Sequence, residues 1–397
     1  MNKFKFLQDS LYNILAMAIP IAILQFLSLP FIGIQLGDEE YGRIVTIISL
    51  YTLLSFPFGN VLNNIRLLYN EEYKRERTSG DFNFLLSTSL FISTLMMIVG
   101  IVYYVENFSL LHLISILLIS GLNLVREYLI VSFRLDLDFK AILYNNYFLG
   151  IGYIYGTFLF YLTGKWQFIF LLGYSISLLY IVRKSDLILE PLVITKLYKK
   201  TTYKSVILLF SSLLKDILNY ADKLLIFPLL GPAAVSIYYT STLIGKIMSM
   251  IITPINGVIL SYIAKYESFS TRRFLSILLV TGIVGVVGYI FSILISPFVL
   301  HLLYPSWATE SLYYIFITTA TAIVGLMGSV VHPFVLKFMH IHWQLVINGS
   351  NVVVYVISSI LLFQQYGLMG FCIGILISNV YQLILLVGIF VFKNKKK

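Results

Sequence analysis

The sequence predicts an all-α polytopic membrane protein with about twelve transmembrane helices in two parallel six-helix repeats. Three observations support this fold class. Of the 397 residues, 59% are hydrophobic and 12% are charged, whereas soluble globular proteins have roughly 45–50% apolar and about 25% charged residues. The chain contains twelve apolar stretches that are long enough to cross a bilayer. A turn near residue 37 recurs near residue 231, which indicates an internal duplication.

The predicted spans follow one another with short connections, so no large domain outside the membrane fits. The first span follows Lys3 and Lys5, as a secretory signal would, but its apolar run continues to Leu36 and is too long for a signal. We therefore interpret it as a retained span. The other spans are apolar runs bounded by charged or turn-forming residues. In chain order the spans are residues 10–36, 44–65, 82–104, 108–132, 143–163, 166–182, 204–229, 236–262, 275–296, 311–335, 343–363 and 367–391.

Lysines and arginines are distributed unevenly between the two sides of the predicted membrane. The termini and alternate connections hold 22 of them, whereas the opposite connections hold only Arg43 and Lys165. Since basic residues concentrate on the cytoplasmic side, both termini are predicted to be cytoplasmic. Topology thus explains the net charge of +10, and nucleic-acid binding is not expected. The longest basic connection, residues 194–204, is expected to lie on anionic membrane lipids as an interfacial helix.

The duplication is visible in the turns that end the first and seventh spans. Residues 31–42 read FIGIQLGDEEYG and residues 225–236 read LIFPLLGPAAVS, which places Gly37 and Gly231 194 residues apart. An even number of spans per copy makes the copies parallel repeats with a seam between them. The alternative is that Leu-Gly is a common helix-ending turn and indicates no duplication. The predicted domains are residues 1–197 and 198–397.

The turn at residues 36–42, the Leu-Gly-Pro at 230–232 and the basic connection between the halves resemble a known family. The chain is similar to the polysaccharide (O-antigen type) flippases of the multidrug/oligosaccharidyl-lipid/polysaccharide exporter superfamily, in span count and repeat length over nearly its whole length. The resemblance implies two six-helix bundles around a central cavity in a bacterial cytoplasmic (inner) membrane. It also implies alternating access that moves a polyprenyl-diphosphate-linked oligosaccharide from the inner to the outer leaflet. A glycan polymerase and other assembly proteins would be partners. The second copy departs from the motif, with Val235-Ser236 where the first has Tyr41-Gly42.

Polar and charged residues gather on one face of several predicted spans. Because an ionisable residue at a helix centre in the membrane costs at least about 2.5–3.5 kcal/mol, such a face must look into protein or water. At 100° per residue, the polar residues of each span fall within an arc of about 80–120°. They are Asn60, Asn63 and Asn64 in the second span; Asn123, Arg126 and Glu127 in the fourth; Lys215, Asp216, Asn219, Asp222 and Lys223 in the seventh; and Thr242, Lys246, Ser249, Thr253 and Asn256 in the eighth.

Convergence of these faces predicts a hydrated cavity with amide and hydroxyl groups for sugars and cations for a diphosphate. Lys246 ranks first among the cations because its own helix has no acid within eight residues. No cofactor, metal ligand or catalytic residue is predicted. Asp216, Asp222 and Glu127 are candidates for coupling transport to a proton or sodium gradient. The predicted substrate-binding residues are Lys246, Lys215, Arg126, Asn219, Asn60, Asn63, Asn123 and Asn256.

Charge compensation is the alternative interpretation of the same residues. The four cations and three acids within the predicted spans sum to a net charge of only +1, so a structural network between helices also explains them. Arg126 and Glu127 are expected to point about 100° apart, as neighbours on a helix do. On the sequence alone, a substrate cavity and a structural network both stay open.

Two other functions are also compatible with the sequence. The acidic Asp38-Glu39-Glu40 in the first outer loop would suit a polyprenyl-sugar-dependent membrane glycosyltransferase, but the chain lacks the large outer domain of such enzymes. These acids also suit a helix-capping turn. A drug or ion exporter of the same superfamily is the second alternative. Since the sequence has no P-loop motif, we do not expect the chain to bind ATP in that way.

Overall fold

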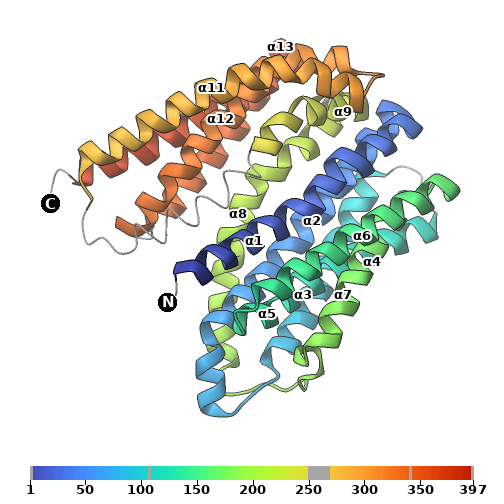
Figure 1. Cartoon of the computed structure of the whole chain (residues 1–397), viewed down its shortest axis with the longest axis vertical. Coiled ribbons are helices and arrows are strands. Elements are labelled where there is room, and N and C mark those ends of the chain that lie inside the picture. Colours follow the sequence, from blue (N-terminus) through green and yellow to red (C-terminus); the bar gives the residue numbers. More distant parts are fainter. Residues whose placement is uncertain (1–2, 106–108, 249–268, 339–341, 395–397) are drawn as a thin grey trace. The chain divides into compact units, whose positions relative to one another are not determined.

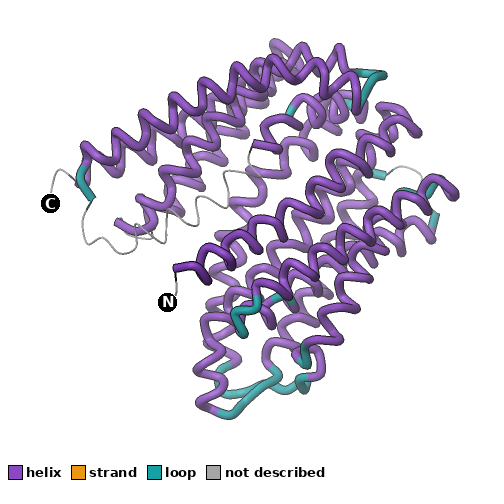
Figure 2. The backbone as a smooth tube through the Cα atoms, in the orientation of Figure 1, coloured by secondary structure: helices purple, strands orange, loops and turns teal. Residues whose placement is uncertain are grey.

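The computed structural model describes residues 3–105, 109–248, 269–338 and 342–394, which form helices joined by turns and short loops (Figure 2). No strand occurs within these ranges. The elements, coloured along the chain in Figure 1, are α1 (Lys3–Ile23), the π-helical turn η1 (Leu24–Ser28), α2 (Leu29–Glu76), α3 (Asp81–Tyr104), α4 (Leu110–Leu129), α5 (Val131–Leu135), α6 (Phe139–Thr163), α7 (Gln167–Lys184), the 3₁₀ turn η2 (Leu187–Leu189), α8 (Tyr198–Leu230), α9 (Pro232–Ser241), α11 (Thr271–Leu303), α12 (Ala308–Phe338) and α13 (His342–Asn394).

Two helical stretches are too long to cross a bilayer once. A continuous helix over residues 14–76 would reach about 95 Å at 1.5 Å per residue, roughly three times the hydrocarbon thickness. Its helical path is interrupted at Gly37 (φ 80°, ψ 178°), and that of α13 is interrupted at Gly367 (φ 57°, ψ −137°). Each stretch is therefore long enough for two of the predicted spans, with the interruption between them. These are residues 10–36 with 44–65, and residues 343–363 with 367–391.

The predicted all-α membrane class is confirmed. Within the described residues, seven helical stretches are long and apolar enough to cross a membrane. The predicted spans at 143–163 and 204–229 lie within α6 and α8. The predicted span at 236–262 begins in α9 and runs into residues 249–262, which lie outside the described ranges. The total of twelve spans in two repeats stays a prediction.

Large apolar side chains cover the surface of the membrane-crossing helices. Val99 on α3 is 72% exposed, and Leu294 and Phe298 on α11 are 75% and 70% exposed. Soluble monomers rarely expose large contiguous apolar patches, whereas lipid tails are as apolar as these side chains. The outer surface of these helices is therefore suited to the bilayer interior.

The chain divides into two compact units. Unit 1 comprises residues 1–35 and 43–224, and unit 2 comprises residues 36–42 and 225–397. The beginning of α8 packs with unit 1, because Tyr73 Oη hydrogen-bonds Thr201 Oγ1 at 2.8 Å and Lys200 Nζ lies 2.8 Å from Glu72. The predicted domain boundary at 197 concerns the duplication and stays a prediction.

The connection between α7 and α8 is tied to the hairpin of α2 and α3. Arg66 makes a bidentate ion pair with Glu190, at 2.5 and 2.8 Å. The Asn83 side-chain amide donates to the Glu190 carbonyl at 2.7 Å. Asp81 accepts hydrogen bonds from the Thr195 backbone amide at 2.7 Å and from its hydroxyl at 2.5 Å. The connection is therefore fastened to unit 1 at both ends.

We expect Glu190→Gln to loosen this connection. The Arg66 side chain is only 8% exposed, and a hydrogen bond to a charged group contributes about 1.5–3 kcal/mol. Limited proteolysis within residues 185–197 should therefore be roughly tenfold faster or more. The control is Glu71→Gln, since Glu71 pairs with Lys74 on the surface, where an ion pair contributes little. Equal cleavage of both variants would contradict the role of Glu190.

Two turns of unit 2 have nearly the same backbone conformation. Gly37 has φ 80° and ψ 178°, and Gly231 has φ 84° and ψ 173°. Only glycine adopts such positive φ angles without steric cost. Because these residues occupy matching positions of the predicted repeats, the shared conformation supports the duplication.

The two turns also pack against each other through equivalent contacts. Ser236 Oγ donates to the Asp38 carbonyl at 2.5 Å. Gly42 lies so close to α9 that a Cβ atom there would be 1.9 Å from the Pro232 carbonyl oxygen. With a repeat of 194 residues, Asp38 corresponds to Pro232 and Gly42 corresponds to Ser236. The contact between Asp38 and Ser236 and the contact between Pro232 and Gly42 therefore join equivalent pairs of positions in the predicted repeats.

Candidate functional site

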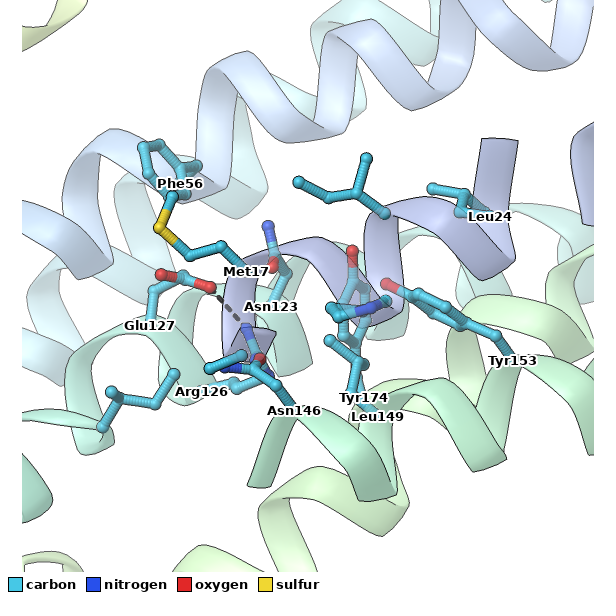
Figure 3. A pocket seen from close by; sticks show the side chains of 14 residues that line it. Met17, Leu24, Phe56, Asn123, Arg126, Glu127, Asn146, Leu149, Tyr153 and Tyr174 are labelled. Atoms are coloured by element: carbon cyan, nitrogen blue, oxygen red, sulfur yellow. Dashed lines mark hydrogen bonds and ion pairs between the residues drawn. The ribbon is translucent and has the colours of Figure 1, made fainter. Parts of the chain in front are cut away.

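A pocket of about 330 Å³ lies within unit 1 (Figure 3). This volume is at the lower end of the range for small-molecule sites, roughly 300–1,000 Å³. Side chains from α1, η1, α2, α4, α6 and α7 surround it. The lining residues are Ala16, Met17, Pro20, Ile21, Leu24, Phe56, Asn123, Arg126, Glu127, Ile130, Asn146, Leu149, Tyr153 and Tyr174.

An apolar wall of the pocket comes from α1 and η1, with Met17, Ile21 and Leu24. Pro20 has no amide hydrogen, so one helical hydrogen bond is missing next to the pocket. The π-helical turn Leu24–Ser28 follows directly, and proline and π-helical turns are both causes of bends in helices. The apolar wall therefore lies where α1 departs from a regular helix.

Arg126 is the centre of the polar wall and is 5% exposed. Its Nη1 donates to Glu127 Oε1 at 2.5 Å and its Nη2 donates to Asn146 Oδ1 at 2.5 Å. Its Nε donates to Ser177 Oγ at 2.8 Å, and Ser177 donates to Asn145 Oδ1 at 2.7 Å. This network joins α4, α6 and α7 and gives each guanidinium nitrogen a protein acceptor.

Amide and phenol groups extend the polar wall. Asn123 on α4 donates to Ser55 Oγ on α2 at 2.7 Å. The Tyr174 hydroxyl lies 3.4 Å from that of Tyr51, and in Figure 3 the hydroxyls of Tyr174 and Tyr153 point toward each other. These groups hydrogen-bond without carrying a charge at neutral pH.

The pocket therefore has faces of different chemistry. In Figure 3, Met17, Leu24 and Phe56 lie on one side, and Arg126 and Asn146 lie on the other. The charge of Arg126 is balanced by the ion pair with Glu127. Such a site can hydrogen-bond an uncharged polar group and pack against an apolar one.

Comparison with solved structures places this site in a known fold. No family model matches the chain, and no curated protein matches it in sequence. An inward-facing multidrug resistance MATE family transporter of the MOP superfamily matches with a TM-score of 0.67 and 13% identity, over 97% of this chain and 98% of that chain. An outward-facing conformation of such a transporter matches with a TM-score of 0.64 and 12% identity, over 98% of this chain and 96% of that chain. The chain has the MATE fold.

A MOP superfamily transporter from Pyrococcus furiosus Vc1 has the same fold. It matches with a TM-score of 0.60 and 14% identity, over 98% of this chain and 96% of that chain, and its structure is described by the reverse polarity of its binding pocket. The matched structures are of the superfamily that the resemblance names, whereas the polysaccharide flippase subtype of this chain stays a prediction. These three matched structures are named as transporters.

Of the residues that the sequence predicts for the substrate or for ion coupling, Asn123, Arg126 and Glu127 line the pocket. The expectation that Arg126 and Glu127 point apart is wrong, because the guanidinium lies 2.5 Å from the carboxylate. Neighbouring positions on a helix are about 100° apart, but the arginine side chain has four rotatable bonds and can bend toward the glutamate. For these two residues the structure has the compensated pair that was the alternative interpretation.

The predicted residues of α8 do not line this pocket. Lys223 pairs with Asp222 at 2.5 Å and also donates to the Asn219 carbonyl at 3.0 Å. Asp216 is buried, whereas the side chains of Lys215 and Asn219 are exposed. This polar face therefore contains one closed ion pair, and its predicted roles in substrate binding and ion coupling stay predictions.

The predicted amides of α2 lie beside the pocket without lining it. Asn63 donates to the Glu127 carbonyl at 2.8 Å and accepts a hydrogen bond from Arg134 Nη1 at 2.5 Å. Asn60 accepts a hydrogen bond from Asn64 at 3.3 Å. These amides therefore continue the polar network from the pocket toward α5.

Lys246 belongs to unit 2. Its Nζ lies 3.1 Å from the centroid of the Tyr239 ring, a cation–π contact, and 3.5 Å from the Tyr239 carbonyl oxygen. Asn256, predicted on the same face, lies outside the described residues. The predicted convergence of this face with those of unit 1 stays a prediction.

Asn146, Tyr153 and Tyr174 are pocket residues that the sequence analysis missed. They lie on α6 and α7, whose predicted spans contain no charged residue that would mark a polar face. The adjacent Asn145 and Asn146 in an otherwise apolar run were the available signal. In the ranges that the structure describes, no group of three or more His, Cys, Asp or Glu residues could hold a metal ion.

Proposed function

We propose that the protein is a transporter that moves a polyprenyl-diphosphate-linked oligosaccharide across a bacterial cytoplasmic membrane by alternating access. Both termini would be cytoplasmic, and a glycan polymerase and other assembly proteins would be partners. The observation that carries this proposal is the pocket of unit 1. Its apolar and polar faces match a substrate that has an apolar chain and a sugar headgroup.

The charge of the pocket favours sugars over a cationic drug. Arg126 and Glu127 neutralise each other, so the wall offers amide and phenol groups and no uncompensated acid. Neutral sugar hydroxyls donate and accept hydrogen bonds, as do Asn123, Asn146 and the tyrosines. Alternating access is supported by the match of the chain to both an inward-facing and an outward-facing structure of the MATE fold.

A drug exporter is the second candidate, because two of the matched structures are named as multidrug resistance transporters. Either transporter needs an energy source, and we propose a proton or sodium gradient. Asp216 is the first candidate for coupling, since it is buried and accepts a hydrogen bond from Ser212 at 3.2 Å. Asp222 and Glu127 are already occupied by ion pairs.

Proteoliposomes that contain the purified chain test the function. We expect an undecaprenyl-diphosphate-linked oligosaccharide to cross the bilayer faster in their presence, measured by access of an external lectin to the sugar. Ethidium movement in the same vesicles tests the drug exporter. Ethidium movement without movement of the lipid-linked sugar would reject the proposed substrate.

Filling the pocket should block this movement. Met17 lines the pocket and is 42% exposed, so Met17→Trp occupies the pocket without disturbing a buried core position. We expect at least tenfold slower lectin access with unchanged protein abundance, as for a lost binding contribution of about 1.4 kcal/mol. Val99→Trp places the same side chain at a 72% exposed position outside the pocket and is the control. Equal rates for both variants would remove the pocket from the transport path.

A further inference from the structure

Arg134, on the short helix α5 that follows α4, is held in place by two amides of α2. Its Nη1 donates to Asn63 Oδ1 at 2.5 Å and to Asn64 Oδ1 at 3.0 Å. Asn64 in turn donates to Asn60 at 3.3 Å. These contacts use both hydrogens of Nη1 and fix the direction of the guanidinium.

The other edge of the same guanidinium is open. Within the described part of the chain, Nε and Nη2 of Arg134 have no hydrogen-bond acceptor, and neither atom is shut off from solvent. Arg126 differs, because all three of its nitrogens have acceptors. Arg66 differs as well, because Glu190 occupies both of its terminal nitrogens.

Arg134 also has no carboxylate partner among the described residues. Asp136 and Asp138 follow it in the chain, but both are exposed, and Asp138 accepts a hydrogen bond from the Ala141 amide at the start of α6. The half-buried charge of Arg134 is therefore balanced only by amide oxygens. A guanidinium in this state favours an anion at its free edge.

The Arg134 guanidinium is connected to the pocket wall through Asn63. Ile130, which lines the pocket, is one helical turn before Arg134. Asn63 links the two places, since it donates to the carbonyl of Glu127, a pocket residue, and accepts from Arg134. One side chain therefore joins a residue of the pocket wall to the arginine.

We propose that Arg134 is an anion-binding residue that holds a phosphate oxyanion through Nε and Nη2. Two parallel N–H···O hydrogen bonds fit two oxygens of one phosphate group. Asn63 and Asn64 act as positioning residues, because they fix the orientation of the guanidinium without touching the anion. The inference rests on the proposed function where it identifies this phosphate with the diphosphate of the transported lipid.

Binding measurements on the full chain in nanodiscs test the site. The probes are inorganic pyrophosphate, undecaprenyl diphosphate and phosphatidylglycerol, and the variants are Arg134→Gln, Arg134→Lys and the control Arg183→Gln. Arg183 is an exposed arginine at the end of α7. We expect Arg134→Gln to weaken undecaprenyl diphosphate binding by about 10- to 100-fold, as for a lost charge-assisted pair. Arg134→Lys keeps the charge but loses the fork, so its affinity should be intermediate, and Arg183→Gln should bind as the original chain does.

The three probes separate the sources of the phosphate. Preference for undecaprenyl diphosphate over phosphatidylglycerol identifies a diphosphate lipid, and equal affinity for pyrophosphate identifies the phosphate group as the whole determinant. Equal binding of every probe by the original chain and Arg134→Gln would overturn the proposal. Binding through Arg134 without movement of a lipid-linked sugar would leave the anion site standing and reject the proposed function. Movement of the lipid-linked sugar without any effect of Arg134→Gln on binding would support the proposed function and reject the anion site.

Discussion

Arg126→Ala is expected to lower the free energy of unfolding by about 3–5 kcal/mol, the effect of leaving a buried charge without its partner. The side chains of Arg126 and Glu127 are only 6% and 19% exposed. Removal of the guanidinium also takes donors from Ser177 and Asn146. Denaturant or thermal unfolding of the purified protein in detergent measures the loss.

A double variant separates the structural role of this pair from a role in transport. Arg126→Met with Glu127→Gln removes both charges at similar volume, and such replacements are often neutral or stabilising. We therefore expect the double variant to recover most of the stability that Arg126→Ala loses. Slow sugar transport by a stable double variant would support substrate contact, whereas full transport would make the pair purely structural. Unchanged unfolding of Arg126→Ala would contradict the compensated network itself.

Gly42→Leu is expected to destabilise unit 2 by about 3 kcal/mol, at the upper end of the usual cost of overpacking. A Cβ atom would lie 1.9 Å from the Pro232 carbonyl oxygen and 2.8 Å from Ser236 Oγ. Because the nearer obstacle is backbone, a change of rotamer cannot relieve the clash. The two turns would have to separate, with loss of the hydrogen bond from Ser236 to Asp38. A lower thermal unfolding midpoint in detergent is the expected readout.

Gly388→Leu is the matched control. Gly388 lies inside α13, and a Cβ atom there would meet no heavy atom within 4 Å. Replacement of glycine inside a helix removes about 1 kcal/mol of unfavourable propensity, so this variant should keep or raise the midpoint. Equal midpoints for the two leucine variants would rule out close packing at Gly42.

The helices could be predicted from the sequence because lipid leaves the backbone little choice. A buried apolar run must satisfy its own amides and carbonyls, so long runs such as 82–104 and 311–335 are helical. The turn at Gly37 could be located because a repeated Leu-Gly ends a span. The alternation of basic connections was equally visible, although the side of the membrane stays a prediction.

The pocket could be predicted only in part. Asn123, Arg126 and Glu127 were found by their position on one helical face. The partners of Arg126 could not be predicted, since Asn146 and Ser177 come from helices whose neighbourhood is set by tertiary packing. Arg134 was counted with the basic loop residues because it lies just beyond the predicted fourth span. Its contact with Asn63 shows that the end of a span can belong to the polar network.

The paired turns of unit 2 also give a physical reason for the sequence difference between the two segments that the predicted duplication relates. Under the predicted duplication the two segments would begin identical, yet two identical bulky residues would collide where the two turns pack together. The first copy has only hydrogen at position 42, and the second copy places the hydroxyl of Ser236 in the space so created. The two turns are thus complementary, like the two halves of a heterodimer, and exchanging residues 36–42 with 230–236 would not restore an equivalent molecule.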